Sequence, residues 1–133
     1  MDHAPPSIHA EVPERIEVCL KAINSISDSV RYQLPSGESN SDRRQEALDI
    51  INLVHDQEYV KLVQNLCSRG ARAISPWDSD TYISKNTFEV CLLAQTAWMD
   101  AVDEVLQNKI SAFAVTRPPG HHALRDQSMG KWI

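Results

Sequence analysis

The sequence of 133 residues predicts an α/β fold that is mostly helical, with one strand of a parallel sheet. Four stretches place apolar residues at the three- and four-residue spacing of amphipathic helices. After the last of them, residues 110–116 form a nearly continuous apolar run, which is typical of a strand covered on both faces. A Pro-Pro-Gly turn and two histidines follow directly. Ligands of such sheets bind beyond the carboxyl ends of the strands, so residues 117–123 are the candidate site.

Composition narrows the class of protein. Hydrophobic residues make up 42% and charged residues 23%, as in globular chains. The net charge of -5 argues against nucleic-acid binding, which needs a basic surface. The N-terminus has no secretory signal pattern, and no apolar run reaches membrane-spanning length. We therefore expect an intracellular protein of the nucleus or cytoplasm, with another organelle left open.

The three cysteines, Cys19, Cys67 and Cys91, are odd in number and lack CxxC spacing. Each falls on the apolar side of a helical pattern, which predicts buried free thiols. Free thiols fit a reducing compartment.

The first helix is expected from near Val12 to near Ser27, because Pro13 suits the first helical position. A second helix should be capped by Ser41 or Asp42, and a third by Asp56. The third should end at Arg69-Gly70. The residues expected to be buried on these helices are Ile16, Cys19, Leu20, Ile23 and Ile26; then Ala47, Leu48, Ile51 and Val54; and then Tyr59, Val60, Val63, Leu66 and Cys67.

Residues 74–82 form an expected ordered loop, whose Asp78 and Asp80 can form turns or bind a ligand. The longest helix is expected over residues 84–107, and Asn108 can take the left-handed conformation that ends it. His55, between the second and third helices, is expected to be a structural histidine bonded to nearby backbone. The expected buried face of the long helix is Phe88, Cys91, Leu92, Trp98, Val102, Val105 and Leu106.

Two adjacent imidazoles, His121 and His122, suggest proton handling or metal binding, because imidazole titrates near neutral pH. Pro118 and Pro119 fix φ and Gly120 permits unusual backbone angles, so the turn should hold both rings in a defined pose. An incidental surface turn remains the alternative. Adjacent residues at a strand end tend to point in different directions, so we expect no metal bound by this chain's own residues.

Four segments, in order, resemble the zinc-dependent histone deacetylase superfamily, which includes the acetylpolyamine amidohydrolases. The resemblance covers about residues 9–130 and is closest to class II-like members. Its segments are His9-Ala-Glu-Val-Pro-Glu-Arg15, with Ala10 where the family usually has proline; Val54-His-Asp-Gln-Glu-Tyr-Val60; Asp80-Thr-Tyr-Ile-Ser84 with Thr87-Phe-Glu89; and Arg117-Pro-Pro-Gly-His-His-Ala123.

The resemblance implies a three-layer α/β/α, arginase-like domain that hydrolyses acetyl-lysine amides with zinc. It makes His122 the general base and His121 its electrostatic or acid partner. Asp80 would accept hydrogen bonds from the substrate backbone at the pocket rim. The residues that would build the turn are Arg117, Pro118, Pro119 and Gly120. The implied substrate is a histone, with a role in chromatin regulation, another acetyl-lysine protein, or an acetylpolyamine.

In the family, zinc polarises the carbonyl and activates the water. Its ligands, an Asp-x-His pair and a later aspartate, and the oxyanion-stabilising tyrosine lie C-terminal to the tandem histidines. The sequence stops at Ile133 and has no counterpart of the family's first strand. We therefore expect an N-terminal portion of the domain that lacks the metal-binding part, binds no zinc by itself and is inactive alone.

Two other functions stay open. One is a non-catalytic interaction or regulatory module that binds a full-length deacetylase or its complex through exposed apolar faces. The other is a metal-binding regulatory module that uses His3, His9 and the two tandem histidines, although no ligand spacing supports it.

Overall fold

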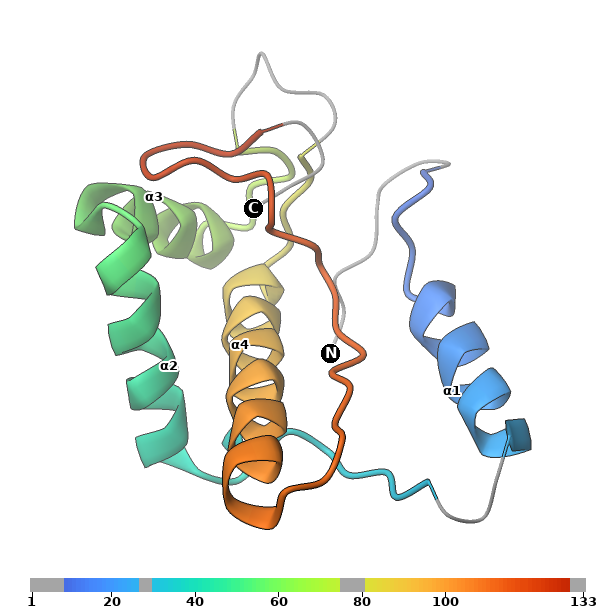
Figure 1. The fold of residues 1–133 in the computed structure, drawn as a ribbon. Helices are drawn as coiled ribbons and strands as arrows, with labels where there is room; N and C mark the ends of the chain where they lie inside the picture. Colours follow the sequence, from blue (N-terminus) through green and yellow to red (C-terminus); the bar gives the residue numbers. More distant parts are fainter. Residues whose placement is uncertain (1–8, 27–29, 75–80, 130–133) are drawn as a thin grey trace.

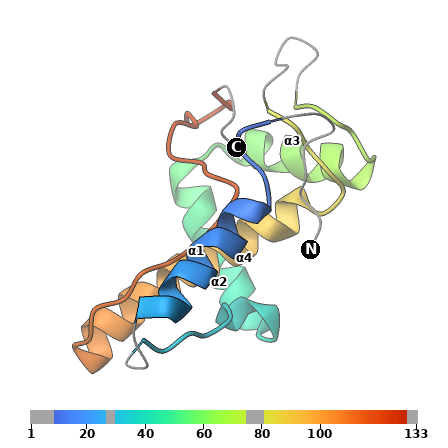
Figure 2. The same ribbon diagram turned by 90° about the vertical axis from the view of Figure 1, so that its right-hand side faces the viewer.

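The computed structural model describes residues 9–26, 30–74 and 81–129, and these are mostly helical. Helices α2 and α4 lie side by side and run in opposite directions, while α3 lies across one end of the pair (Figure 1). Helix α1 lies on the opposite side of α4 from α2 (Figure 2). The elements are α1 Glu14–Ile26, the 3-10 turn η1 Ser36–Glu38, α2 Ser41–Val54, α3 Gln57–Ser68, α4 Thr87–Asp103 and the π-helical turn η2 Glu104–Asn108.

The core is built around α3. Tyr59, Val63 and Cys67 recur on one face of the helix and are buried together with Ile83, which precedes α4. The partly buried Phe88 packs on this cluster from α4. The expected apolar face of the third helix is thus confirmed, and so is its end, because Gly70 takes a positive φ of 69°.

Helix α2 starts as expected, but Asn40 caps it rather than Ser41 or Asp42. The Asn40 side chain accepts hydrogen bonds from the backbone N–H groups of Asp42 and Arg43, at 3.0 and 3.1 Å. An amide oxygen one residue before the helix satisfies two N–H groups that lack intrahelical partners.

Turn η1 meets α4 at a close backbone approach. Gly37 is buried, and a Cβ atom there would lie 2.6 Å from Cγ2 and 2.7 Å from Oγ1 of Thr96, which is fully buried. Ser36 secures the same contact, because its N–H and hydroxyl donate to the Asp100 carboxylate, each at 2.7 Å. Only glycine fits at position 37 without moving α4.

Gly37→Ala is therefore expected to destabilise the fold by about 1–3 kcal/mol, because overpacking forces a shift of the neighbouring side chain or backbone. Urea unfolding followed by circular dichroism measures the change. Thr96→Ala should relieve part of the loss in the double variant. In Gly70→Ala, which is strained by its positive φ alone with nothing within 4 Å, Thr96→Ala should bring no relief. Absence of rescue at Gly37 would contradict the steric explanation.

The expected burial of α1 is wrong. None of its residues is fully buried: of the five expected to be buried, Ile26 is 73% exposed, and Ile16, Leu20 and Ile23 are only partly buried. An apolar stripe is buried only where another element covers it, and α1 has no extensive contact with another described helix. Cys19 is accordingly exposed, which corrects the expectation of three buried thiols, whereas Cys67 is buried and Cys91 partly buried.

The long helix is shorter than expected and changes type at its end. Regular α-helix stops at Asp103, the π-helical turn η2 follows, and Lys109 rather than Asn108 takes the left-handed conformation, with φ 57°. Leu92 is buried, but four residues of the expected buried face are exposed: Trp98, Val102, Val105 and Leu106. Among the described helices, none has the length and apolar composition needed to cross a bilayer.

The expected strand at residues 110–116 is also wrong. This segment runs back beside α4 (Figure 1) without belonging to any strand. Phe113 within it is 84% exposed. The described residues show an isolated bridge between Ala73 and Tyr82, and Met129 also takes part in a bridge, but none of the three belongs to a strand. A strand exists only where a neighbouring backbone pairs with it. What the structure supports is a mostly helical chain, without a strand among the described residues.

Candidate functional site

A buried ion pair joins the two ends of the described chain. Glu11 is 4% exposed, and its carboxylate accepts from Arg117 at both oxygens: 2.9 Å from Nε to Oε1 and 2.7 Å from Nη2 to Oε2. This two-bond geometry fixes the guanidinium in orientation as well as position. The residue expected to build the turn therefore has a specific partner 106 residues away.

Tyr82 completes this arrangement, here named the Glu11–Tyr82–Arg117 cluster. The Tyr82 hydroxyl donates to Glu11 Oε2 at 2.5 Å and accepts from Arg117 Nη2 at 2.9 Å. His9 packs edge-on against the Tyr82 ring, with centroids 5.4 Å apart, and accepts the Glu11 N–H at Nδ1. The cluster thus connects three of the four segments on which the family resemblance rests.

The cluster balances its own charge. Burial alone would lower the pKa of Arg117, but the hydrogen bonds and the charges of Glu11 and Tyr82 raise it overall. The guanidinium therefore keeps its charge in the protein interior, where the Glu11 side chain is its hydrogen-bonded partner. Arg15 approaches Glu11 from the exposed side at 3.7 Å.

Tyr82 should make the fold sensitive to alkaline pH. Burial, together with the hydrogen bond to Glu11, raises its pKa above the usual value. The unfolded chain loses this proton first, so stability is complete below about pH 10 and falls as pH rises further. Tyr82→Phe should make the fall in unfolding free energy between about pH 10 and 11 shallower, by up to about 1.4 kcal/mol per pH unit.

Urea unfolding at several pH values measures how the unfolding free energy changes with pH in the wild type and in Tyr82→Phe. Burial also raises the pKa of Cys67, and that of Cys91 to about 12. Both thiols titrate in both proteins and cancel in the comparison. Equal slopes in the wild type and Tyr82→Phe would contradict the assignment.

The two tandem histidines lie on the exposed loop that follows the cluster. The rings of His121 and His122 have centroids 4.2 Å apart and are tilted by 43°. The backbone turns at this point, since Ala123 N–H donates to the Gly120 carbonyl at 2.9 Å. The Arg117-Pro118 peptide bond is cis. Both imidazoles are thus adjacent to each other and accessible from solvent.

A second set of contacts, here named the His55–Asp56 anchor, holds the other side of this loop. His55 Nδ1 donates to the Leu124 carbonyl at 2.9 Å, and Asp56 N–H donates to the Arg125 carbonyl at 2.9 Å. The Arg125 side chain returns to the Asp56 carboxylate, with Nε 2.5 Å from Oδ1. The structural role expected for His55 agrees with this geometry. Residues 54–60, the one resembling segment outside the Glu11–Tyr82–Arg117 cluster, contact the loop here.

Sequence reasoning identified the histidine pair, gave Arg117 and His55 structural roles, and missed the residues that bond to Arg117 or hold the loop beside His55. Glu11, Tyr82 and Asp56 carried no local signal of a site, although all three lie within the segments that resemble the family. Asp80, the expected substrate-binding residue, lies outside the described residues, two positions before Tyr82.

The part of the chain that the structure describes does not fit a metal ion. It contains no group of three or more His, Cys, Asp or Glu side chains that could hold one. His9 is occupied within the cluster region, and His3 lies outside the described residues. The resemblance implies a zinc ion, but no step through zinc follows from these residues.

Known proteins are similar in sequence to this chain along most of its length. The histone deacetylase domain model matches residues 9–130. An uncharacterised protein of Synechocystis is 33% identical over 131 residues, covering 96% of this chain and 40% of the relative. A probable deacetylase of Methanothermobacter thermautotrophicus is 33% identical over 122 residues, covering 92% of this chain and 33% of the relative.

A histone deacetylase-like amidohydrolase of Pseudomonas aeruginosa is 32% identical over 124 residues, covering 92% of this chain and 30% of the relative. The chain therefore spans less than half the length of these relatives. The matched region includes both sides of the anchored histidine loop. By this match the chain belongs to the histone deacetylase family, of whose domain it represents a part.

Proposed function

We propose that this chain provides the tandem-histidine part of an active site that hydrolyses acetyl-lysine amides or acetylpolyamines. His122 is the general base and His121 its electrostatic or acid partner. The observation that carries the proposal is the geometry of the loop: two accessible imidazoles, 4.2 Å apart, between the Glu11–Tyr82–Arg117 cluster and the His55–Asp56 anchor.

Amide hydrolysis gives such a pair a clear task. A base must take a proton from the attacking water, and a second group must stabilise charge or return a proton to the leaving amine. One imidazole of an adjacent pair can accept while the other donates. A general base contributes only if it is held within hydrogen-bond reach of its proton, which explains why both sides of the loop are anchored.

Asp80 is proposed, from the resemblance alone, to accept hydrogen bonds from the substrate backbone at the pocket rim. Tyr82, two residues later, is held within the Glu11–Tyr82–Arg117 cluster. This anchoring would fix the position at which the segment enters the site.

A chimera tests the proposal. Residues 9–130 of this chain would replace the matching segment of the Pseudomonas aeruginosa histone deacetylase-like amidohydrolase, which supplies the remainder of that protein. Turnover of an acetyl-lysine peptide by the folded, zinc-loaded chimera would support the proposal. A chimera with native circular dichroism and full zinc content but no turnover would refute it.

The 133-residue chain is proposed to be inactive by itself, because its described residues offer no metal site. The purified chain with added zinc and an acetyl-lysine peptide should show no turnover above that of zinc in buffer. Turnover that His122→Ala abolishes would overturn this part of the proposal.

A second candidate function, a non-catalytic module that binds a deacetylase or its complex, is favoured by exposed apolar residues. Phe113 and Leu53 are each 84% exposed, and Ile26 is 73% exposed. Large exposed apolar side chains are typical of surfaces that another protein covers.

The purified chain is accordingly expected to bind a hydrophobic dye and to associate as its concentration rises. Phe113→Ser should lower both, since it removes an apolar ring that is already in water. Lys85→Ser, at another exposed position, serves as the control and should change neither. Dye fluorescence and sedimentation velocity measure the two effects. A monomer that binds no dye would contradict the expectation.

A further inference from the structure

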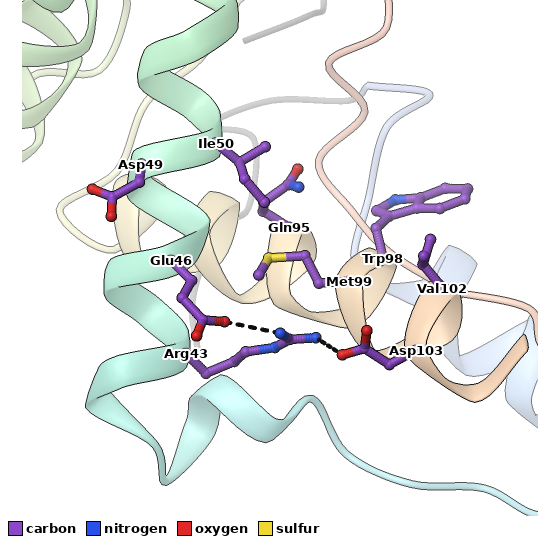
Figure 3. A pocket seen from close by; sticks show the side chains of 9 residues that line it. All are labelled: Arg43, Glu46, Asp49, Ile50, Gln95, Trp98, Met99, Val102 and Asp103. Atoms are coloured by element: carbon purple, nitrogen blue, oxygen red, sulfur yellow. Dashed lines mark hydrogen bonds and ion pairs between the residues drawn. The ribbon is translucent and has the colours of Figure 1, made fainter. Parts of the chain in front are cut away.

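A surface groove separates α2 from α4, and the activity proposed above does not use it. Its volume is about 590 Å³. Figure 3 shows the side chains of α2 and α4 that line it. Its apolar lining comes from Ile50 on α2 and from Trp98, Met99 and Val102 on α4. Trp98 and Val102 are 54% and 53% exposed, although they lie one helical turn apart on the same face. The groove therefore has an apolar floor that is open to water.

The rim of the groove is acidic. Arg43 is its one cation, and three carboxylates surround that guanidinium: Glu46 at 2.9 Å, Asp100 at 3.2 Å and Asp103 at 2.5 Å. Asp49 adds a fourth carboxylate one turn beyond Glu46. Asp100 does not line the groove, so among the lining residues three carboxylates against one guanidinium leave a surplus of two negative charges, and the Glu46 side chain is 58% exposed. The positive charge is already paired, so cations of a partner would meet free carboxylate oxygens.

We propose that the α2–α4 groove binds a basic amphipathic helix of another protein, whose apolar side chains lie on Trp98 and Val102 and whose Lys or Arg residues face Glu46 and Asp49. Two neighbouring helices that leave an apolar groove offer the usual seat for an amphipathic helix. The acidic rim selects a basic partner through charge complementarity.

The same observations exclude other occupants. A second copy of this chain carries a net charge of -5, and bringing two acidic rims together is repulsive. A small ligand needs a site that buries most of its surface, whereas two of the floor residues are more than half exposed. A nucleic acid would be repelled by the carboxylates.

A defined probe tests the proposal with the whole 133-residue chain. It is a fluorescent 18-residue peptide of Leu and Lys whose leucines form one helical face. One comparison peptide carries Glu in place of Lys, and another has the same Leu and Lys residues in an order without an apolar face. Fluorescence anisotropy at low salt should show binding of the first peptide at least about tenfold tighter than of either comparison, because both the apolar face and the positive charges contribute.

Two variants locate the site. Val102→Glu, on the floor, should weaken the Leu-Lys peptide at least about tenfold, while Leu53→Glu, at an exposed α2 position outside the groove, should not. Glu46→Gln/Asp49→Asn should weaken it about three- to tenfold, an effect that shrinks as salt rises. Its matched control with the same change in net charge is Glu17→Gln/Glu58→Gln, which alters exposed residues elsewhere.

Equal binding of the Lys and Glu peptides would overturn the proposal, and so would binding of the peptide without an apolar face. A rim variant that binds like its charge-matched control would also overturn it. The rim variant retains the apolar floor, and Arg43 keeps Asp100 and Asp103, so this comparison remains informative if Val102→Glu does not fold.

Discussion

Glu11→Ala is expected to lower the free energy of unfolding by about 3–5 kcal/mol, because it leaves the buried Arg117 guanidinium without its carboxylate. The side chains of the pair are only 5% and 10% exposed, so water cannot replace the lost partner. The Tyr82 hydroxyl would also lose the oxygen to which it donates at 2.5 Å. Urea unfolding followed by circular dichroism measures the loss.

Two controls test whether the loss of stability comes from the buried Glu11–Arg117 pair or would follow the removal of any charged side chain. Arg15→Ala removes the exposed cation 3.7 Å from the same carboxylate and should cost less than about 1 kcal/mol. Glu11→Leu/Arg117→Met replaces both charges by apolar groups and should recover much of the stability that Glu11→Ala loses. A Glu11→Ala loss no larger than that of Arg15→Ala would show that the cluster contributes little to stability.

The wrong expectations share one physical origin. The apolar stripe of α3 predicted its burial because Ile83 and Phe88 cover it. The stripe of α1 is also regular, yet no other described helix packs extensively against it, and none of its residues is fully buried. Periodicity shows which face of a helix is apolar, and it does not show which element lies against that face. The same reasoning applies to residues 110–116, whose apolar run suits a strand but needs a neighbouring backbone to become one.

The candidate site was predictable only in part for a different reason. His121 and His122 are adjacent in sequence, so their pairing could be read directly. Glu11 and Arg117 are 106 positions apart, and Tyr82 and Glu11 are 71 apart. No local pattern encodes such a contact. The resemblance placed these residues in order along the chain without indicating that they touch.

Contacts from the other three segments hold the histidine loop at both ends. The Glu11–Tyr82–Arg117 cluster fixes the chain four residues before His121, and the His55–Asp56 anchor fixes it two residues after His122. A short loop held at both ends has little freedom, so the two rings should keep their relative placement when a substrate arrives. Such preorganisation is what general acid–base catalysis requires.

In the chimera with the Pseudomonas aeruginosa relative, His122→Ala is expected to lower kcat/KM by about 10²–10⁴-fold, the usual contribution of a positioned acid or base. His121→Ala should have a smaller effect, because an electrostatic partner adjusts the reaction without accepting the water's proton. Steady-state assays with an acetyl-lysine peptide measure both variants. Zinc content and circular dichroism should match those of the unsubstituted chimera.

His55→Ala distinguishes catalysis from loop placement. It removes the bond to the Leu124 carbonyl but no reacting group, so it should lower stability and, by loosening the placement of the base, lower kcat by less than His122→Ala does. His122→Ala should lower kcat strongly and leave stability unchanged, since its imidazole is exposed. If His122→Ala kept more than about a tenth of the activity, the general base would have to be another group, and His121 would be the first residue to examine.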